Sequence, residues 1–300
     1  MGELPLTARD FLLRFPLIAG VGRHSALVCW RWLVDHPQLL PLTPETLDYL
    51  LAAVHLPAKR AMALRRQLFT DVLAHAVTAS LTRCRAVTLA DRHYPALLRE
   101  IYEPPVVLYF QGRLDLVTRP PLAVVGSRHP TDYAFRAMRQ LLPAVSRQGV
   151  CLISGLAQGV DTLTHQVALA HGGTTIAVVG TELGRCYPAK NRALMDQLCQ
   201  AHLVVSEYPW DARGAKHHFV ERNRIIAGLC QSVLVVEAAH HSGSLITANF
   251  ALQENRNVLA VPGNIDGKNS VGTNELILAG AKPILNSEHI MEELLVDKRP

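Results

Sequence analysis

Hydrophobic residues follow two different patterns along the 300-residue chain. Between residues 7 and 80, leucines and alanines recur at helical spacing and prolines interrupt them, which predicts a series of short helices. After residue 118 the pattern changes to short, nearly continuous apolar runs, which are typical of strands buried on both faces of a parallel sheet. The runs are Leu122–Val125, Val150–Ile153, Thr175–Val179, Leu203–Val205, Val233–Val236 and Val258–Val261.

The two patterns predict two domains joined by an entry segment. We expect a helical domain over residues 1–85 and an α/β domain over residues 119–300, because helical patterns separate the apolar runs. Between them, residues 86–118 contain Pro104-Pro105 and then the β-branched and aromatic run Val106–Phe110, which predicts a short strand. The expected α/β fold is a mostly parallel sheet with helices on both faces.

The first two runs end in glycine-containing turns. Gly126-Ser127-Arg128 follows the first run, and the segment from Ser154 to Asp161 follows the second. Ligands bind at the carboxyl ends of strands in such sheets. Glycine lets backbone N–H groups approach an anion, and the next helix presents its positive end there. Arg128 adds a planar donor fork suited to phosphate. We interpret these turns as a phosphate-binding platform.

The later runs also end in small residues, hydroxyl groups or helix starts, and many such loops at one edge of a sheet predict a ligand site. The first turn lacks the G-x-G-x-x-G pattern, so a dinucleotide is not expected. The segments concerned are Gly180-Thr181, Tyr187-Pro188-Ala189-Lys190-Asn191, Ser206-Glu207-Tyr208-Pro209, Ser242-Gly243-Ser244 with Thr247, and Pro262-Gly263-Asn264 with Gly272-Thr273-Asn274.

Three features have two interpretations each. A predicted helix over Phe219–Leu229 has arginines near its start, where cations are unfavourable unless an anion or an acidic side chain compensates. Asp161 and His165 share a helical face and suit either acid–base work or a capping aspartate beside a packed histidine, which we favour. The turn from Phe15 to Arg23 resembles a DNA-binding helix-hairpin-helix, but a bundle turn that requires glycine is favoured.

Charge and cysteine content restrict the classes of function. The net charge of +5 is uneven: residues 119–230 contain 12 Lys and Arg against 7 Asp and Glu, and residues 231–300 contain 5 against 8. The basic excess therefore coincides with the glycine turns and favours an anionic partner. The six cysteines are scattered, which indicates free thiols in a reducing cytoplasm and no metal site. Neither a membrane span nor a signal peptide is expected.

Together these residues resemble the DprA/Smf family, the DNA-processing proteins of bacterial natural transformation. The resemblance covers about Tyr94 to Glu293, and its motifs occur in order at the predicted strand ends. They are Gly126-Ser127-Arg128, Ser154-Gly155-Leu156-Ala157 with Gly159 and Asp161, Gly180-Thr181 with Tyr187-Pro188, Arg222-Asn223-Arg224, Ser242-Gly243-Ser244 with Thr247, and Val261-Pro262-Gly263.

The resemblance implies an extended Rossmann-like domain behind a sterile-alpha-motif-like (SAM-like) helical module. It also implies a homodimer that binds and protects single-stranded DNA and helps load the RecA recombinase, with no cofactor and no catalytic residue. The family's lysine after the Tyr-Pro step falls on Ala189, with Lys190 next to it. Many members end in a winged-helix domain, for which we expect no room before Pro300. The implied binding residues are Gly126, Ser127, Arg128, Ser154, Gly155, Leu156, Ala157, Gly159, Asp161, Gly180, Lys190, Asn191, Arg222, Asn223, Arg224, Ser242, Gly243, Ser244, Thr247, Pro262 and Gly263.

An enzyme is the alternative. Related Rossmann-like proteins with a Pro-Gly-Gly-x-Gly-Thr loop cleave nucleoside monophosphates. The corresponding stretch here, Pro262-Gly263-Asn264, lacks the second glycine and is separated from Gly272-Thr273, which argues against this activity. A nucleotide sensor without turnover is a third hypothesis.

Overall fold

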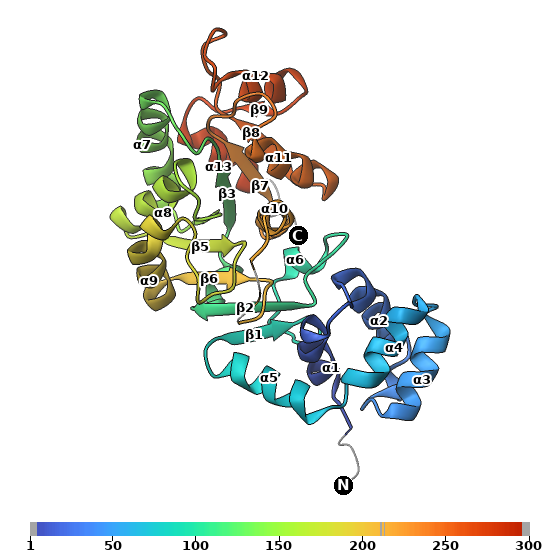
Figure 1. The fold of residues 1–300 in the computed structure, drawn as a ribbon. Coiled ribbons are helices and arrows are strands. Elements are labelled where there is room, and N and C mark those ends of the chain that lie inside the picture. Colours follow the sequence, from blue (N-terminus) through green and yellow to red (C-terminus); the bar gives the residue numbers. More distant parts are fainter. Residues whose placement is uncertain (1–4, 211, 213, 296–300) are drawn as a thin grey trace. The chain divides into compact units, whose positions relative to one another are not determined.

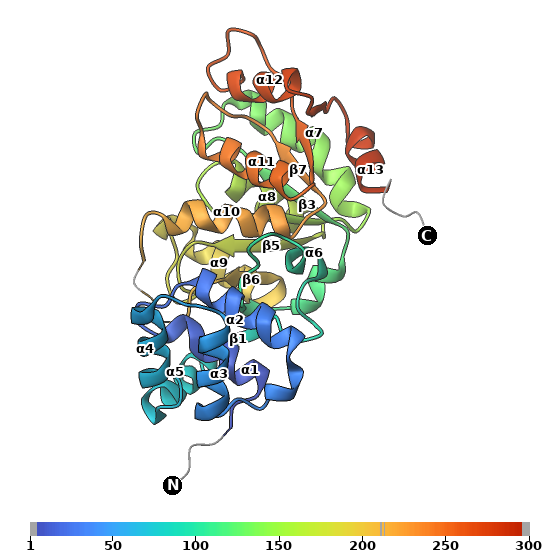
Figure 2. The same ribbon diagram turned by 90° about the vertical axis from the view of Figure 1, so that its right-hand side faces the viewer.

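The chain forms two compact units in a computed structural model that describes residues 5–210, 212 and 214–295 (Figures 1 and 2). The first unit comprises residues 1–109 and 207–212, and the second comprises residues 110–206 and 213–300. The chain passes from the first unit to the second within the segment that the sequence marks as an entry segment. We describe each unit separately.

The first unit is helical up to residue 81, as the spacing of its leucines predicts. Threonine side chains cap three of its helices: Thr7 and Thr43 form capping boxes, and Thr70 accepts a hydrogen bond from the Leu73 N–H. These caps satisfy amides that the helix itself leaves unpaired. The helices are α1 (Ala8–Arg14), η1 (Phe15–Leu17), α2 (Arg23–Asp35), η2 (Pro37–Leu39), α3 (Pro44–Ala53), α4 (Ala58–Gln67) and α5 (Asp71–Leu81).

Three shorter elements follow the helices: β1 (Arg85–Thr88), α6 (Ala96–Arg99) and β2 (Val107–Gly112). Strand β2 confirms the strand predicted after the double proline. Strand β1 was not predicted, because Arg85 and Thr88 leave only two apolar residues in it and so no continuous apolar run.

The second unit contains seven parallel strands in the order β6-β5-β4-β3-β7-β8-β9. All six apolar runs of the sequence are strands. The order from β5 to β9 is that of the doubly wound dinucleotide-binding fold, and its direction of winding reverses between β3 and β7. The strands are β3 (Pro121–Val125), β4 (Cys151–Ser154), β5 (Thr174–Val179), β6 (Leu203–Ser206), β7 (Ser232–Val235), β8 (Asn257–Ala260) and β9 (Lys282–Pro283).

Helices cover both faces of this sheet. Helices α7 (Asp132–Arg147), α8 (Val160–Ala170) and α13 (Ser287–Leu295) cover one face, and α10 (His218–Gly228) and α11 (Gly243–Gln253) cover the other. Beside them lie η3 (Leu114–Thr118), η4 (Ala189–Asn191), α9 (Arg192–Ala201) and α12 (Val271–Leu278). This arrangement confirms the extended Rossmann-like α/β fold.

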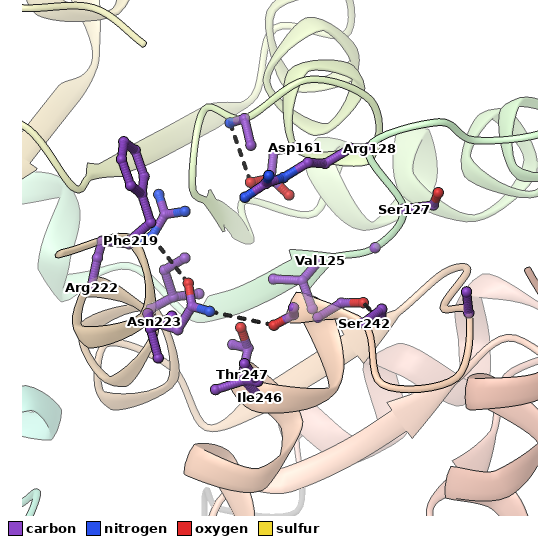
Figure 3. A pocket seen from close by; sticks show the side chains of 17 residues that line it. Val125, Ser127, Arg128, Asp161, Phe219, Arg222, Asn223, Ser242, Ile246 and Thr247 are labelled. Atoms are coloured by element: carbon purple, nitrogen blue, oxygen red, sulfur yellow. Dashed lines mark hydrogen bonds between the residues drawn. The ribbon is translucent and has the colours of Figure 1, made fainter. Parts of the chain in front are cut away.

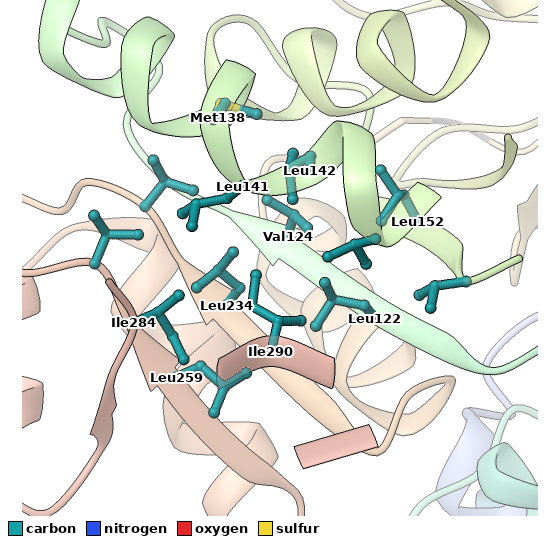
Figure 4. Packing of buried hydrophobic residues seen from close by; sticks show 14 of the residues in the cluster. Leu122, Val124, Met138, Leu141, Leu142, Leu152, Leu234, Leu259, Ile284 and Ile290 are labelled. Atoms are coloured by element: carbon teal, nitrogen blue, oxygen red, sulfur yellow. The ribbon is translucent and has the colours of Figure 1, made fainter. Parts of the chain in front are cut away.

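Alternation along each strand divides the core between the two faces. Leu122 and Val124 of β3 pack with Leu152, Leu234 and Leu259 of the neighbouring strands against α7, α8 and α13 (Figure 4). The intervening residues of the same strands are buried on the other side. Burial on both faces explains why the strands read as continuous apolar runs. It also fixes the strand ends, and so the loops that follow them.

Candidate phosphate-binding site

A pocket of about 340 Å³ lies at the carboxyl ends of β3 and β7, where the winding of the sheet reverses (Figure 3). Ligands of doubly wound sheets bind at this point. We call this cavity the first pocket. Its lining residues are Val125, Gly126, Ser127, Arg128, Ala157, Asp161, Phe219, Val220, Arg222, Asn223, Ile226, Ala239, Ser242, Gly243, Ser244, Ile246 and Thr247.

Two glycines bring the turns after β3 and β4 together. A Cβ atom on Gly126 would lie 2.7 Å from Val160 Cγ2, and one on Gly159 would lie 2.3 Å from the Ser127 carbonyl oxygen. Gly159 also has a φ of +86°, which side chains disfavour. The Val160 N–H donates to the Ser127 carbonyl at 3.1 Å. These glycines therefore serve close packing of the backbone, which shapes the wall of the pocket.

Arg222 supports the opposite wall. It is buried, and its guanidinium donates to the carbonyls of Gly155 and Val178. A side chain at Gly155 would fall 2.3 Å from this guanidinium, which explains the glycine. The sequence placed the arginines at the start of the helix, but α10 begins at His218, so they lie beyond its first turn. Arg224 is also buried and does not line the first pocket.

Asp161 is the carboxylate of the first pocket. It lies in the first turn of α8 and accepts a hydrogen bond from the Ala157 N–H at 3.3 Å. Burial raises the pKa of this carboxyl, and the positive charge of Arg222 and the bonds from neighbouring N–H groups oppose that rise. The carboxylate thus closes the turn after β4. The sequence predicted a capping aspartate, but the N-cap of α8 is Gly159 and Asp161 is the second residue of the helix, so its side chain does not cap the helix.

His165 does not line the first pocket. It is fully buried on α8, and the Thr175 hydroxyl donates to the Leu152 carbonyl at 2.6 Å. That hydroxyl therefore accepts from His165 Nδ1 at 2.7 Å, so the neutral ring carries its proton on Nδ1. Burial lowers the pKa of this imidazole to about 3. These contacts support the packed histidine that the sequence favours.

The first turn of α11 forms another wall. Ser242 precedes the helix, and its hydroxyl lies 2.8 Å from the Ser244 hydroxyl without capping a backbone N–H. Asn223 of α10 reaches this turn through a bond from Nδ2 to the Gly243 carbonyl at 3.4 Å. The uncapped start of an 11-residue helix presents backbone N–H groups and a positive dipole end, which suit an anion.

Arg128 and Lys190 are exposed cations at this edge of the sheet. In the part of the chain that the structure describes, neither has a hydrogen-bond or ion-pair partner. Arg128 lines the first pocket, whereas Lys190 does not. Lys190 precedes Asn191, whose Nδ2 donates to the Leu156 carbonyl at 2.8 Å. This bond holds the η4 segment beside the turn after β4, next to the pocket wall.

Three further predicted residues after β4 and β5, namely Ser154, Leu156 and Gly180, support the walls of the first pocket without lining it. The Ser154 hydroxyl donates to the Val124 carbonyl at 2.7 Å, and Leu156 is buried with a φ of +57°. A Cβ atom on Gly180 would lie 3.0 Å from the Phe219 ring. Gly180 thus lets α10 approach the end of β5.

Pro262 and Gly263, which the sequence grouped with the same platform, line a different cavity of about 600 Å³. We call it the second pocket. The chain reverses after β8 into a loop that faces α7, so these residues lie apart from the lining of the first pocket. The lining of the second pocket consists of Thr131, Tyr133, Arg136, Glu237, Pro262, Gly263, Asn264, Gly267, Lys268, Asn269 and Ser270.

The sequence indicated Phe219 as an aromatic candidate near the turns, together with Tyr133, Tyr187 and Tyr208, but it did not predict the other apolar lining residues. Val125 and Ile246 lie in the first pocket, and α10 contributes Phe219 and Ile226 on the same face as Arg222. The ring of Phe219 lies 5.2 Å from that of Tyr187. Residues 219, 222 and 226 are spaced so that they share one helical face, and this spacing can be seen in the sequence. The sequence alone could not distinguish a face that lines a pocket from an ordinary buried face.

The turn between η1 and α2 is engaged within the first unit. Gly20 has a φ of +82°, as a glycine turn requires, and Arg23 Nε lies 3.2 Å from Glu103 Oε2. Because Glu103 neutralises the arginine of this turn, the contacts favour the bundle turn over a DNA-binding hairpin.

Within residues 5–210, 212 and 214–295, no group of three His, Cys, Asp or Glu side chains could hold a metal ion. No described helix combines the length and the hydropathy that crossing a bilayer requires. All six cysteines are free thiols.

Comparison with known proteins gives consistent matches. The family described as DNA recombination-mediator protein A matches residues 85–295. The DNA processing protein DprA of Streptococcus pneumoniae is 44% identical over 206 residues, which are 69% of this chain and 73% of that protein. DprA of Bacillus subtilis is 38% identical over 209 residues, 69% of this chain and 70% of that protein.

Two solved structures are also similar. The crystal structure of S. pneumoniae DprA matches with a TM-score of 0.85 and 35% identity, covering 97% of this chain and 99% of that one. DprA of Helicobacter pylori matches with a TM-score of 0.64 and 29% identity, covering 73% of this chain and 99% of that one. The H. pylori structure is described as revealing that protein's mode of binding single-stranded DNA.

Proposed function

Because the chain belongs to the DprA/Smf family of DNA recombination mediators, we propose that its first pocket binds the backbone of single-stranded DNA. The observation that carries this proposal is the position of Arg128. Its guanidinium lines the first pocket, is exposed and has no partner among the described residues. A free planar cation beside an uncapped helix start suits a phosphate of any sequence.

The shape of the first pocket supports a single strand as the ligand. A solvent-accessible pocket lined by Phe219, Ile226 and Ile246 as well as by polar groups offers apolar surface to an unpaired base. In a duplex the base faces are stacked on one another, whereas a single strand can place them on aromatic side chains. The H. pylori relative is described as binding single-stranded DNA, which agrees with this proposal.

We propose further that the protein holds its ligand without chemical turnover. Asp161, the carboxylate of the first pocket, closes the turn after β4 through the Ala157 N–H and faces the buried Arg222. Its raised pKa therefore follows from its structural place, without a catalytic role. Incubation with AMP and an assay for free adenine tests this proposal. Release of adenine at a rate that depends on Asp161 would support the enzyme instead.

A comparison of Arg128→Ala with Arg147→Ala tests the binding proposal. Arg147 is the last residue of α7 and therefore lies at the opposite edge of the sheet from the first pocket. Each of the two variants loses one positive charge. We expect the wild type to bind single strands more tightly than duplexes, and less tightly as salt rises. Arg128→Ala should weaken binding about tenfold or more, because a charge-assisted hydrogen bond contributes roughly 1.5–3 kcal/mol.

In the same titrations Arg147→Ala should bind like the wild type, and both variants should keep the wild-type unfolding midpoint. Equal affinities for Arg128→Ala and Arg147→Ala would exclude the first pocket as the DNA site.

The family also motivates proposals about partners. We propose a homodimer that protects incoming strands and promotes RecA assembly on them, in the cytoplasm, where the six free thiols would remain reduced. Sedimentation should then give the mass of two 33.0 kDa chains. RecA nucleation on a strand coated with single-strand-binding protein should be faster with the wild type than with Arg128→Ala. A monomer, or RecA kinetics that ignore the protein, would contradict these proposals.

A further inference from the structure

The second pocket lies between α7 and the loop that follows β8. Tyr133 and Arg136 come from α7, three residues apart and therefore on one helical face. Lys268 and the glycines of the loop lie opposite. The cavity of about 600 Å³ is larger than the first pocket, and the chemistry proposed for the first pocket does not use it.

The walls of the second pocket are held in place without a ligand. Asn274 bonds Gly263 twice, through the Gly263 N–H at 3.2 Å and the Gly263 carbonyl at 3.1 Å. Buried Glu237 accepts from the N–H and hydroxyl of Thr131 and from Asn269 Nδ2. The carboxylate is thus satisfied by the wall itself, and the pocket is preformed.

Tyr133 presents a fixed ring at the mouth of this cavity. Its hydroxyl donates to the Pro262 carbonyl at 2.5 Å, which ties the helix to the loop and sets the ring orientation. The residue is 37% exposed, so part of the ring is accessible to a ligand. An anchored, accessible aromatic ring is the kind of platform on which nucleic acid bases stack.

Two cations flank the ring. Arg136 and Lys268 are exposed, and neither has a hydrogen-bond or ion-pair partner among the described residues. With Glu237, whose bonds lie within the wall, the lining charges sum to one positive charge. Since the two cations come from different elements, they suit two successive phosphates of a chain better than one enclosed phosphate.

The second pocket adjoins the first through one ridge of backbone. Asn269 Nδ2, in the second pocket, donates to the His129 carbonyl at 2.9 Å and lies 3.5 Å from Ser127 Oγ, in the first. Thr131 lies four positions after Ser127 in the chain, a span of at most about 14 Å for extended chain. A strand leaving the first pocket reaches the second within a few nucleotides.

We infer that the second pocket is a further subsite for the same single strand. In this inference, which rests on the proposed function, Tyr133 stacks one base while Arg136 and Lys268 contact the adjoining phosphates. One single strand is thus bound in two places, one on each side of the ridge from Ser127 to Thr131.

A thymidine dinucleotide and an oligothymidine of about 16 nucleotides, the upper site size of small strand-binding domains, test this inference. The dinucleotide, the short strand of the test, fills one pocket, and the long strand reaches both. The Arg136→Ala/Lys268→Ala double variant should bind the long strand with a salt slope lower by about 1.4, since each phosphate contact on a single strand contributes about 0.7. Its binding of the short strand should be unchanged.

Variants of Tyr133 distinguish the stacking of a base on its ring from the hydrogen bond between its hydroxyl and the Pro262 carbonyl. Tyr133→Leu should weaken long-strand binding about tenfold, the loss expected for one stacked base. Tyr133→Phe keeps the ring and should lose much less. The double variant removes only exposed groups that have no partner within the described ranges of the chain, so the test stays valid even if Tyr133→Leu folds poorly.

Arg147→Ala is the control, because it removes one exposed positive charge at the end of α7, away from the lining of both pockets. A long-strand salt slope for the double variant equal to that of Arg147→Ala, or tighter binding of thymidine monophosphate than of the long strand, would overturn the second subsite. If binding still depended on Arg128 in that case, only this inference would fail. If no variant and no wild-type protein bound single strands, the proposed function would fail as well.

Discussion

The first and second pockets adjoin the same ridge but are built by different means. The first depends on backbone segments packed so closely that Gly126, Gly155 and Gly159 leave no room for a Cβ atom, and on buried charges such as Arg222. The second depends on side-chain bonds and has its cations on the surface. The difference teaches that shape and charge are supplied by separate residues. Substitutions of the buried wall residues of the first pocket should affect folding, whereas substitutions of the exposed cations of either pocket should affect binding alone.

The largest effect is expected for Gly159→Ala. A Cβ atom there would lie 2.3 Å from the Ser127 carbonyl, at a φ of +86°. Strain of about 1–2 kcal/mol from the left-handed backbone and about 1–3 kcal/mol from overpacking should together lower the free energy of unfolding by about 4 kcal/mol. Urea denaturation measures this loss.

Gly149→Ala is the control for that variant. Gly149 has a nearly equal φ of +83°, but a Cβ atom there meets nothing within 4 Å. It should therefore cost only about 1–2 kcal/mol. Equal losses for the two variants would mean that close packing of the turns contributes nothing to the first pocket.

Arg222→Met should have the next largest effect. The methionine keeps much of the buried stem but leaves the carbonyls of Gly155 and Val178 without this donor. We expect a loss of about 3 kcal/mol in unfolding free energy, because unsatisfied buried acceptors are costly. Arg222→Lys keeps the charge and should lose less. If Arg222→Met unfolded like the wild type, the wall would not depend on this side chain.

Asp161→Asn should change the pH dependence of stability. Because the pKa of the buried carboxyl is raised above its unfolded value, the native state holds its proton more tightly. This group therefore stabilises the fold below about pH 4 and loses that contribution as pH rises through the raised pKa. The stability of Asp161→Asn relative to the wild type should increase with pH across this window. A constant difference in urea titrations at several pH values would contradict the assignment.

The smallest effect on stability is expected in the second pocket. Arg136→Ala and Lys268→Ala remove exposed side chains that have no hydrogen-bond or ion-pair partner among the residues that the structure describes. Each should change the free energy of unfolding by less than about 0.5 kcal/mol, as is usual for such surface substitutions. Thermal unfolding of both variants beside the wild type checks this. A loss above about 1 kcal/mol in either would remove the contrast between the two pockets.

The sequence by itself determined the sheet and the places where its loops lie. Strands β3 to β8 are buried on both faces, so each had to be a continuous apolar run, and each run predicted a strand. The motifs after these runs also identified most of the polar lining of the first pocket, from Gly126-Ser127-Arg128 to Ser242-Gly243-Ser244. Strands β1 and β9 were missed because Arg85–Thr88 and Lys282–Pro283 do not form continuous apolar runs.

Only the tertiary structure decided which of the predicted residues share a cavity. Arg128, Arg222 and Arg224 carry the same functional group but lie in different surroundings. Buried Arg222 donates to two backbone carbonyls, and Arg224 is buried outside the lining of the first pocket. Arg128 lines the pocket and has no partner among the described residues. Pro262-Gly263 follows a strand end like the other motifs, yet its loop faces α7 and forms the second pocket. Sequence patterns report local period and turn chemistry, whereas burial and partner choice depend on segments distant in the chain.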